Sequence, residues 1–454
     1  MAKLTRKEIT TETFEMAWPS VMESVLIALA GMVDTYMVST LGKAAVSSIG
    51  VTNQPKFFMY TGFFAMCTVI SLFVARRLGE KKRKEANQLF VSGFCMVLIL
   101  CIVMSVFNVI FADPFMRFAG ANADTIAYSV RYFRIVMGFS IFNLLSMYIN
   151  AAQRGSGNTK IAMTTNIASN AVNVVMNYLL INGHFGFPAL GVIGAAIATV
   201  IGTVVAFAMS VQTLFRKNSY VQVQYILEEK IRPSMACIRE MTPTAATIFS
   251  ENILTRAGMM ISSAMTARIG TAPYAAHLVG MNFMTLGSAF GEGLQSASIA
   301  LVGRSIGEKD IEKAKQYTWS GQTFGLMISI TVSVLMVIFD DQIFNLYFPN
   351  DAEMIGYGRI ISTFFAFILP IMVSKIVFGG VLRGAGDVRY VMICSTIGVT
   401  LVQPIAMYIL QVQMNLGLVA AWGSILISQA SQFLMFASRY LSGKWEKYAM
   451  IGQG

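Results

Sequence analysis

The stretch ANQLFVSGFCMVLILCIVMSVFNVIFA, residues 86–112, contains no Asp, Glu, Lys or Arg. About 20 mostly apolar residues in succession allow a helix to cross the hydrocarbon core of a bilayer. The same absence of acidic and basic residues recurs over 161–215, 316–339 and 390–438. Two of these runs are too long for one crossing, and turn-forming residues break them near Asn182–Pro188 and Gln413–Asn415. The pattern predicts an all-α, polytopic membrane protein.

The composition supports this class of protein. Of 454 residues, 55% are hydrophobic and only 13% are charged, whereas soluble domains carry about 25% charged residues. Soluble enzymes, disordered chains, collagens and disulfide scaffolds are therefore excluded. The five cysteines are odd in number and form no CxxC pair, so we expect free thiols rather than disulfides or metal ligands.

Working outward from the charge-free runs, we predict twelve transmembrane helices. Their approximate ranges are 14–39, 47–75, 87–112, 123–150, 161–182, 190–215, 235–267, 273–302, 317–340, 356–381, 390–411 and 416–438.

The net charge of +11 has a specific origin in this chain. Basic residues collect in the connections after the even-numbered predicted helices, as in Arg76–Lys84 and Arg304–Lys315. Lys and Arg are enriched in cytoplasmic loops of membrane proteins. We therefore expect these connections and both termini to be cytoplasmic, and we exclude nucleic acid as a partner.

The two halves of the sequence repeat. Arg77–Lys81 matches Ser305–Lys309, and Arg154–Asn158 matches Arg383–Asp387, each about 228 positions later. Six helices per repeat is an even number, so the halves share one orientation in the membrane. We predict two six-helix lobes related by a parallel pseudo-two-fold axis, with a cavity between them. The expected boundaries are 1–215 for the N-terminal lobe, 216–234 for a cytoplasmic linker, and 235–454 for the C-terminal lobe.

Charges inside predicted helices are costly and mark candidate functional sites. Asp34 is the strongest of them because it follows the apolar run Ser24–Val33. A carboxylate in this position can bind a proton or Na⁺, since burial in low dielectric favours its protonated form. The alternative is a static carboxylate held by hydroxyl or amide groups.

Polar residues of two further helices could contribute to the same site. Asn173 and Asn177 are four residues apart, so both amides project from one helix face. Their oxygens suit a hard cation such as Na⁺ or can contact a neighbouring carboxylate; interhelical hydrogen bonding is the alternative. Thr199 gives a weaker signal, because its small neighbours indicate close helix packing first.

Glu251 and Arg256 lie within the seventh predicted helix. They form either a structural pair or a substrate-facing site that attracts cations. The roles of four other intramembrane charges stay open, because each can pair, line a wet cavity or extend to the membrane surface. These are Glu23, Lys56, Glu292 and Lys375.

Motifs for catalysis are missing from the sequence. There is no GxxxxGK[ST] phosphate loop, no HExxH and no convincing Ser/His/Asp set. We therefore expect a transporter without a cofactor rather than an enzyme or an ATP-driven pump.

Taken together, the motifs resemble those of the multidrug and toxic compound extrusion (MATE) family of bacterial type over nearly the whole chain. Each motif is short, but their order across two repeats is specific. They are Pro19 with Val33-Asp34-Thr35, Arg77-Leu78-Gly79, Gln153–Gly157, Asn173 with Asn177, Leu190–Ala196, Ala275-Ala276-His277 and Leu382–Asp387.

The resemblance implies an antiporter of the bacterial cytoplasmic membrane that exports organic cations or amphipathic compounds in exchange for inward Na⁺ or H⁺. It implies that Asp34 couples the ion, with Asn173, Asn177 and Thr199 around it, and that Glu251 serves the C-terminal lobe. Because one chain holds both lobes, we expect it to work as a monomer. The substrate and the choice between Na⁺ and H⁺ stay open.

This sequence departs from the family in two places. Some members carry an acid just after the proline of the tenth helix, but here Ile371 and Met372 follow Pro370. Some members also have an aspartate where this chain has Asn177. The first departure shifts weight away from a cation site in the C-terminal lobe and toward Asp34, and the second lowers the charge expected around Asn177.

Other classes of membrane protein are weaker fits. A lipid or lipid-linked oligosaccharide flippase is the main alternative, although such proteins often have extra helices and a strongly cationic cavity. A channel would need a symmetric polar pore, and a membrane enzyme would need a reactive constellation; neither is visible in the sequence.

Overall fold

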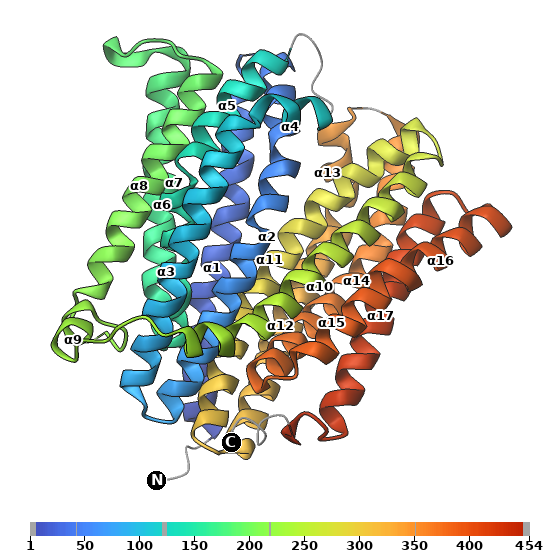
Figure 1. Cartoon of the computed structure of the whole chain (residues 1–454). Helices are drawn as coiled ribbons and strands as arrows, with labels where there is room; N and C mark the ends of the chain where they lie inside the picture. Colours follow the sequence, from blue (N-terminus) through green and yellow to red (C-terminus); the bar gives the residue numbers. More distant parts are fainter. Residues whose placement is uncertain (1–5, 42, 120–124, 218, 350, 448–454) are drawn as a thin grey trace. The chain divides into compact units, whose positions relative to one another are not determined.

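The computed structural model describes residues 6–41, 43–119, 125–217, 219–349 and 351–447, and these ranges are helical with no β-strand (Figure 1). The elements in chain order are α1 (Arg6–Ser39), α2 (Lys43–Gly79), α3 (Arg83–Ile110), α4 (Ala112–Phe118), α5 (Ile126–Gly138), α6 (Ser140–Gly155), α7 (Thr159–Asn182), η1 (His184–Gly186), α8 (Val192–Leu214), α9 (Val223–Glu228), α10 (Met235–Ala267), α11 (Thr271–Gly307), α12 (Ile311–Ile338), α13 (Asp340–Tyr347), α14 (Ala352–Ala385), α15 (Val388–Thr396), η2 (Ile397–Val402), α16 (Gln403–Tyr408), η3 (Ile409–Gln413) and α17 (Leu418–Leu441).

The prediction of a polytopic all-α membrane protein is confirmed. Among the described residues, eight helical segments are long and apolar enough to cross a membrane, and the bent pair α5 and α6 makes a ninth. Three more helices, α7, α10 and α11, have 24, 33 and 37 residues and coincide with the remaining predicted spans. Polar and charged residues lower the apolar character of these three helices: Asn173 and Asn177 in α7, Glu251 in α10 and Glu292 in α11.

The predicted span 123–150 is not one straight helix. It bends by 45° between α5 and α6, where Phe139 leaves helical geometry with φ −102° and ψ 12°. The Ser140 hydroxyl donates to the carbonyl of Met137 at 2.8 Å. A side chain that bonds a carbonyl of the preceding turn in this way stabilises a kink.

Tertiary contacts divide the chain into two units. The continuous unit comprises residues 26–245, and the discontinuous unit comprises residues 1–25 and 246–454. In the continuous unit, α3, α6, α7 and α8 pack side by side (Figure 1). In the discontinuous unit, α14 packs against α11, α12 and α17.

These units differ from the expected lobes at the first helix of each half. The start of α1 packs in the discontinuous unit, where Glu12 pairs with Arg304 of α11 at 2.8 Å. A side chain added at Gly293 of α11 would collide with the backbone of Val21, so the two helices touch closely at this point. The segment 6–25 therefore belongs with the second half of the sequence.

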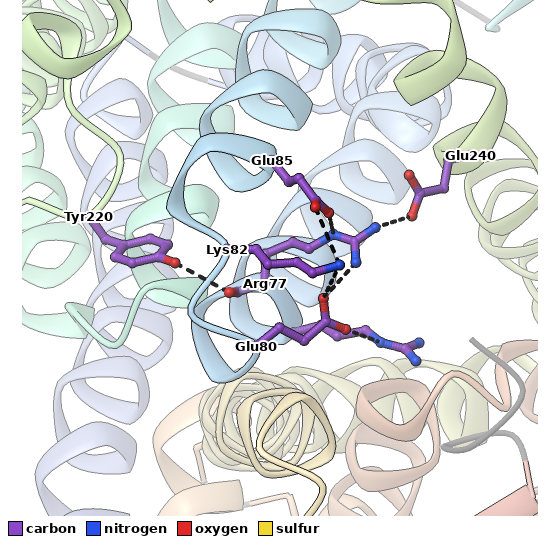
Figure 2. Close-up of polar contacts among 7 residues, drawn as sticks. Arg77, Glu80, Lys82, Glu85, Tyr220 and Glu240 are labelled. Carbon is purple, nitrogen blue, oxygen red and sulfur yellow. Dashed lines mark hydrogen bonds and ion pairs between the residues drawn. The ribbon is translucent and has the colours of Figure 1, made fainter. Parts of the chain in front are cut away.

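The start of α10 likewise belongs to the continuous unit and not to the second half of the sequence, together with the segment 216–234 that precedes it. Glu240 pairs with Arg77 at the end of α2, at 3.0 Å. Figure 2 shows Arg77 between this glutamate, Glu80 at 2.6 Å and Glu85 at 3.2 Å. Glu12 and Glu240 are separated by the offset of the sequence repeat, whereas Arg304 lies 228 positions after Arg76 and not after Arg77. The two glutamates are thus equivalent, and they pair with adjacent positions of the repeated motif.

The repeated glycine motifs have a common structural reason. A side chain at Gly155 of α6 would collide with the carbonyl of Ser71 in α2, and one at Gly384 of α14 would lie 3.0 Å from the carbonyl of Ile299 in α11. Two residues further along, Gly157 and Gly386 adopt φ of +90° and +95°. These left-handed residues end one helix and permit the next to begin.

Candidate functional site

Asp34 lies in a polar cluster formed by three helices of the continuous unit. Asn177 of α7 donates from Nδ2 to Asp34 Oδ1 of α1 at 2.8 Å. The same nitrogen donates to Asn173 Oδ1 at 3.2 Å, and Asn173 Nδ2 is 3.5 Å from the Thr199 hydroxyl of α8. The structure therefore brings together all four residues that the sequence predicted for the ion site.

Helix geometry explains this arrangement. The spacing of four residues places Asn173 and Asn177 on one face of α7, and both side chains are buried. Gly202 of α8 lies against Asn173 and Ser169 of α7, where an added side chain would be 3.1 Å from Asn173 Cβ. Because α7 and α8 approach so closely, Thr199 reaches the amide of Asn173.

The cluster offers more oxygen atoms than its internal bonds use. Asn177 is 1% exposed, and its Oδ1 has no hydrogen-bond partner within the described ranges. With the Asn173 amide rotated by 180°, its nitrogen would stand 2.6 Å from Asp34 Oδ1. Two amides and one carboxylate therefore provide ligands of the kind that hard cations prefer.

Two residues that the sequence did not assign to this site also approach it. Lys56 of α2 interacts electrostatically with Asp34, and Tyr132 of α5 lies beside Thr199 and Asp34. Lys56 is the more consequential, because its ammonium group is a tethered cation beside the only carboxylate of the cluster. No local sequence pattern indicates this proximity.

Glu251 has a different environment. It is 4% exposed, and its Oε1 accepts from Arg383 Nη2 of α14 at 2.7 Å. Lys375 of α14 also interacts with Glu251 and donates to Gln432 Oε1 of α17 at 3.3 Å. The arginine paired with Glu251 is thus Arg383, whereas Arg256 has an exposed side chain.

The two remaining intramembrane acids, Glu23 and Glu292, differ in their exposure. Glu23 is buried in the discontinuous unit, at 7% exposure. Glu292 is exposed on α11, where its carboxylate accepts from Ser288 at 3.4 Å.

Known proteins resemble this chain in both sequence and fold. Residues 19–179 and 247–409 match the MatE family. A Thermotoga maritima protein named probable multidrug resistance protein NorM is 26% identical over 454 residues, with 98% of this chain and 95% of that protein covered. A Bacillus subtilis protein named uncharacterized transporter YisQ is 24% identical over 444 residues, covering 97% and 96% of the two chains.

Two solved structures illustrate the likeness of fold. A MATE structure in a bent conformation superposes with a TM-score of 0.87 at 20% identity, covering 98% of both chains. A Pyrococcus furiosus transporter of the MOP superfamily, described as having a binding pocket of reverse polarity that suggests a different function, gives 0.86 at 19% identity and covers 98% and 97%. The family match over both halves leads to one conclusion: the chain belongs to the MATE (MatE) family of membrane transporters and is not an enzyme.

Proposed function

We propose that this chain is a secondary active antiporter that exports cationic or amphipathic compounds in exchange for inward Na⁺ or H⁺. The observation that carries this proposal is the cluster of Asp34, Asn173, Asn177 and Thr199, which holds a carboxylate against amides and leaves the buried Oδ1 of Asn177 without a partner. The relative named a probable multidrug resistance protein supports the class of substrate.

In this mechanism the positive charge that compensates the Asp34 carboxylate alternates between the Lys56 ammonium and the coupling ion. Without a coupling ion, the Lys56 ammonium compensates the carboxylate. A Na⁺ ion would take oxygen ligands from Asp34, Asn177 and Asn173, whereas a proton would neutralise the carboxylate directly. Either ion competes with Lys56 for Asp34, so binding weakens the electrostatic interaction between these residues of α1 and α2. An ion drives a conformational change only through such a difference in affinity between two states.

We further propose that the protein functions as a monomer in the bacterial cytoplasmic membrane, with both termini in the cytoplasm. The concentration of Lys and Arg after the even-numbered spans supports this orientation. A reporter that is active only in the cytoplasm, fused to either end, should be active. Activity only of a periplasmic reporter would reverse the assignment.

The coupling can be tested with purified protein in proteoliposomes. Efflux of a fluorescent organic cation is followed while a Na⁺ gradient or a pH gradient is imposed separately. We expect one gradient to drive transport, and we expect Asp34→Asn to abolish gradient-driven transport while the protein remains folded. Full transport by that variant, or equal transport without any gradient, would contradict the proposal.

A lipid or lipid-linked oligosaccharide flippase is the second candidate. One observation favours it: two basic residues, Lys375 and Arg383, surround the single acid Glu251, and the excess positive charge would suit an anionic headgroup. The same proteoliposomes, loaded with a fluorescent anionic lipid, distinguish the two candidates. Gradient-independent lipid movement without efflux of organic cations would favour the flippase.

A further inference from the structure

A polar cavity of about 350 Å³ lies in the continuous unit, away from the cluster around Asp34. It opens among the ends of α2, α6 and α8, on the side of the membrane that we propose to be cytoplasmic. Its lining combines two cations with uncharged polar groups and contains no acid: Leu78, Arg83, Gln153, Ser156, Asn158, Lys217, Ser219 and Tyr220.

One of the two cations is held rigidly in place. Arg83 Nε donates to the carbonyl of Tyr220 at 3.1 Å, and its Nη2 donates to the carbonyl of Ser219 at 3.0 Å. The guanidinium lies 4.2 Å from the ring centre of Tyr225. Tyr220 in turn bonds the backbone of Arg77 at 3.2 Å (Figure 2). The cavity wall is therefore ordered, and its positive charge is compensated by carbonyl dipoles rather than by a carboxylate.

Gln153 supplies the second and independent sign of a ligand. Its side chain is fully buried, at 0% exposure, and it lines the cavity. Its Oε1 lies 3.0 Å from the Ser219 oxygen, whose single proton is donated to the Val221 carbonyl at 2.7 Å, and Nε2 has no hydrogen-bond partner among the described residues. A buried donor without a partner is costly, so a ligand oxygen is the natural partner for this nitrogen.

The equivalent place in the second half of the chain shows that the fold does not require this polarity. Gln153 precedes the repeated motif that begins at Arg154, and Leu382, also at 0% exposure, precedes the motif that begins at Arg383. In that half, Asp387 forms an ion pair with Arg439 at 2.7 Å. The apolar side chain and the ion pair thus replace what is a polar cavity in the first half.

We propose that this cavity binds a phosphate group, supplied by the headgroup of an anionic phospholipid of the adjacent leaflet. Phosphate oxygens accept hydrogen bonds and carry the negative charge that Lys217 and Arg83 would compensate. Gln153 Nε2 donates the buried bond, and the N-terminus of α7 after Asn158 adds a favourable dipole, because no side chain caps that helix. Basic pockets at this level of a membrane protein suit anionic headgroups.

Thermal unfolding of the full-length protein in detergent tests the proposal. The probes are dioleoylphosphatidylglycerol, dioleoylphosphatidylcholine and inorganic phosphate, each titrated separately. We expect phosphatidylglycerol to raise the melting temperature at lower concentration than phosphatidylcholine. Lys217→Gln should weaken this effect about fivefold, whereas Arg216→Gln, which removes the neighbouring charge outside the cavity lining, should leave it unchanged.

A second variant separates binding from folding. Gln153→Leu introduces the residue of the second half and leaves Ser219 bonded to the Val221 carbonyl at 2.7 Å. We expect it to unfold at the wild-type temperature in phosphatidylcholine and to lose about tenfold in affinity for phosphatidylglycerol. If inorganic phosphate stabilises the protein with the same dependence on Lys217 and Gln153, the phosphate group is confirmed and its source is soluble. Equal responses to all three probes, or equal losses in Lys217→Gln and Arg216→Gln, would overturn the site.

Discussion

The two halves of this transporter hold their intramembrane acids in opposite ways. In the first half, Asp34 accepts a hydrogen bond from the neutral amide of Asn177 at 2.8 Å, and a lysine approaches it. In the second half, Glu251 is bonded directly to Arg383 at 2.7 Å. Arg383 already compensates the charge of Glu251, whereas the amides around Asp34 are neutral. Asn177 Oδ1 and Glu251 Oε2 are both buried without a hydrogen-bond partner among the described residues, so the two sites differ in the charge of the partner and not in the supply of oxygen.

Comparison of equivalent positions sharpens the difference. The residue about 228 positions after Asp34 is Ser262, and the one after Lys56 is Met284. When the helix starts at Gly191 and Gly417 are aligned, Thr199 corresponds to Ile425. The repeat thus preserves the helices and their glycine contacts but not the polar cluster. We infer that ion exchange belongs to the first half and that Glu251 stabilises the second.

The largest effect is expected from breaking the ion pair of the second half. Glu251→Gln would leave Arg383 and Lys375 buried without a carboxylate, which we expect to lower the free energy of unfolding by about 3–5 kcal/mol. Denaturation in detergent would measure this loss, and the double variant Glu251→Leu with Arg383→Leu should recover most of it. Wild-type stability in Glu251→Gln, combined with lost ion dependence, would show that Glu251 is the ion site.

Removing an amide should impair the first half without unfolding it. We expect Asn177→Ala to reduce gradient-driven efflux by about 10–100-fold, because such partners orient the groups that bind the ion. Asn170→Ala, two turns before Asn177 on α7 and outside the hydrogen-bonded cluster, is the matched control and should transport normally. Efflux from proteoliposomes measures both variants. Equal impairment of the two would assign the amides to helix packing.

The tethered lysine gives a smaller and opposite effect. Lys56→Met introduces the residue of the second half and removes the competitor for Asp34. If Na⁺ is the coupling ion, we expect half-maximal transport at about tenfold lower Na⁺, since a nearby charge pair contributes roughly 1–2 kcal/mol. The Na⁺ dependence of efflux provides the measurement. A weaker response to Na⁺ would mean that Lys56 orients the carboxylate instead.

The smallest effects are expected where the halves are most alike. The Glu12 carboxylate is less exposed than that of Glu240, at 27% against 42%, and it also accepts a hydrogen bond from Tyr317, although Arg304 is more exposed than Arg77. We expect Glu12→Gln to cost about 1 kcal/mol and Glu240→Gln about half of that or less. Melting temperatures of the two variants, compared at low and high salt, provide the measurement. The reverse order would mean that other contacts hold the starts of α1 and α10.

Much of the site could be predicted where the physics is local. The spacing of Asn173 and Asn177 places both amides on one face of a helix, and the apolar run before Asp34 places its carboxylate at membrane depth. The structure brings them together at hydrogen-bond distance. The helices likewise follow from the charge-free runs, apart from the bend at Phe139, which lies between Gly138 and Ser140 and has no proline beside it.

Contacts between distant segments could not be predicted in this way. Arg256 is close to Glu251 in sequence, but five residues along a helix turn it to another face, and Arg383 reaches the carboxylate from α14 instead. Lys56 interacts electrostatically with Asp34 from another helix, 22 residues along the chain, and no local sequence pattern places the two near each other. The packing of the start of α1 with the second half of the sequence could not be predicted for the same reason, since Glu12 and its partner Arg304 are 292 residues apart.

That separation has a consequence for how the protein is made. Chains emerge from the ribosome at about 5–20 residues per second, so Glu12 waits roughly 15–60 s before Arg304 exists. Residues 26–245 are all translated by then, while the beginning of α1 still lacks the residues that it packs against. The beginning of α1 is thus translated early, but it can complete its packing only after the second half of the chain is made.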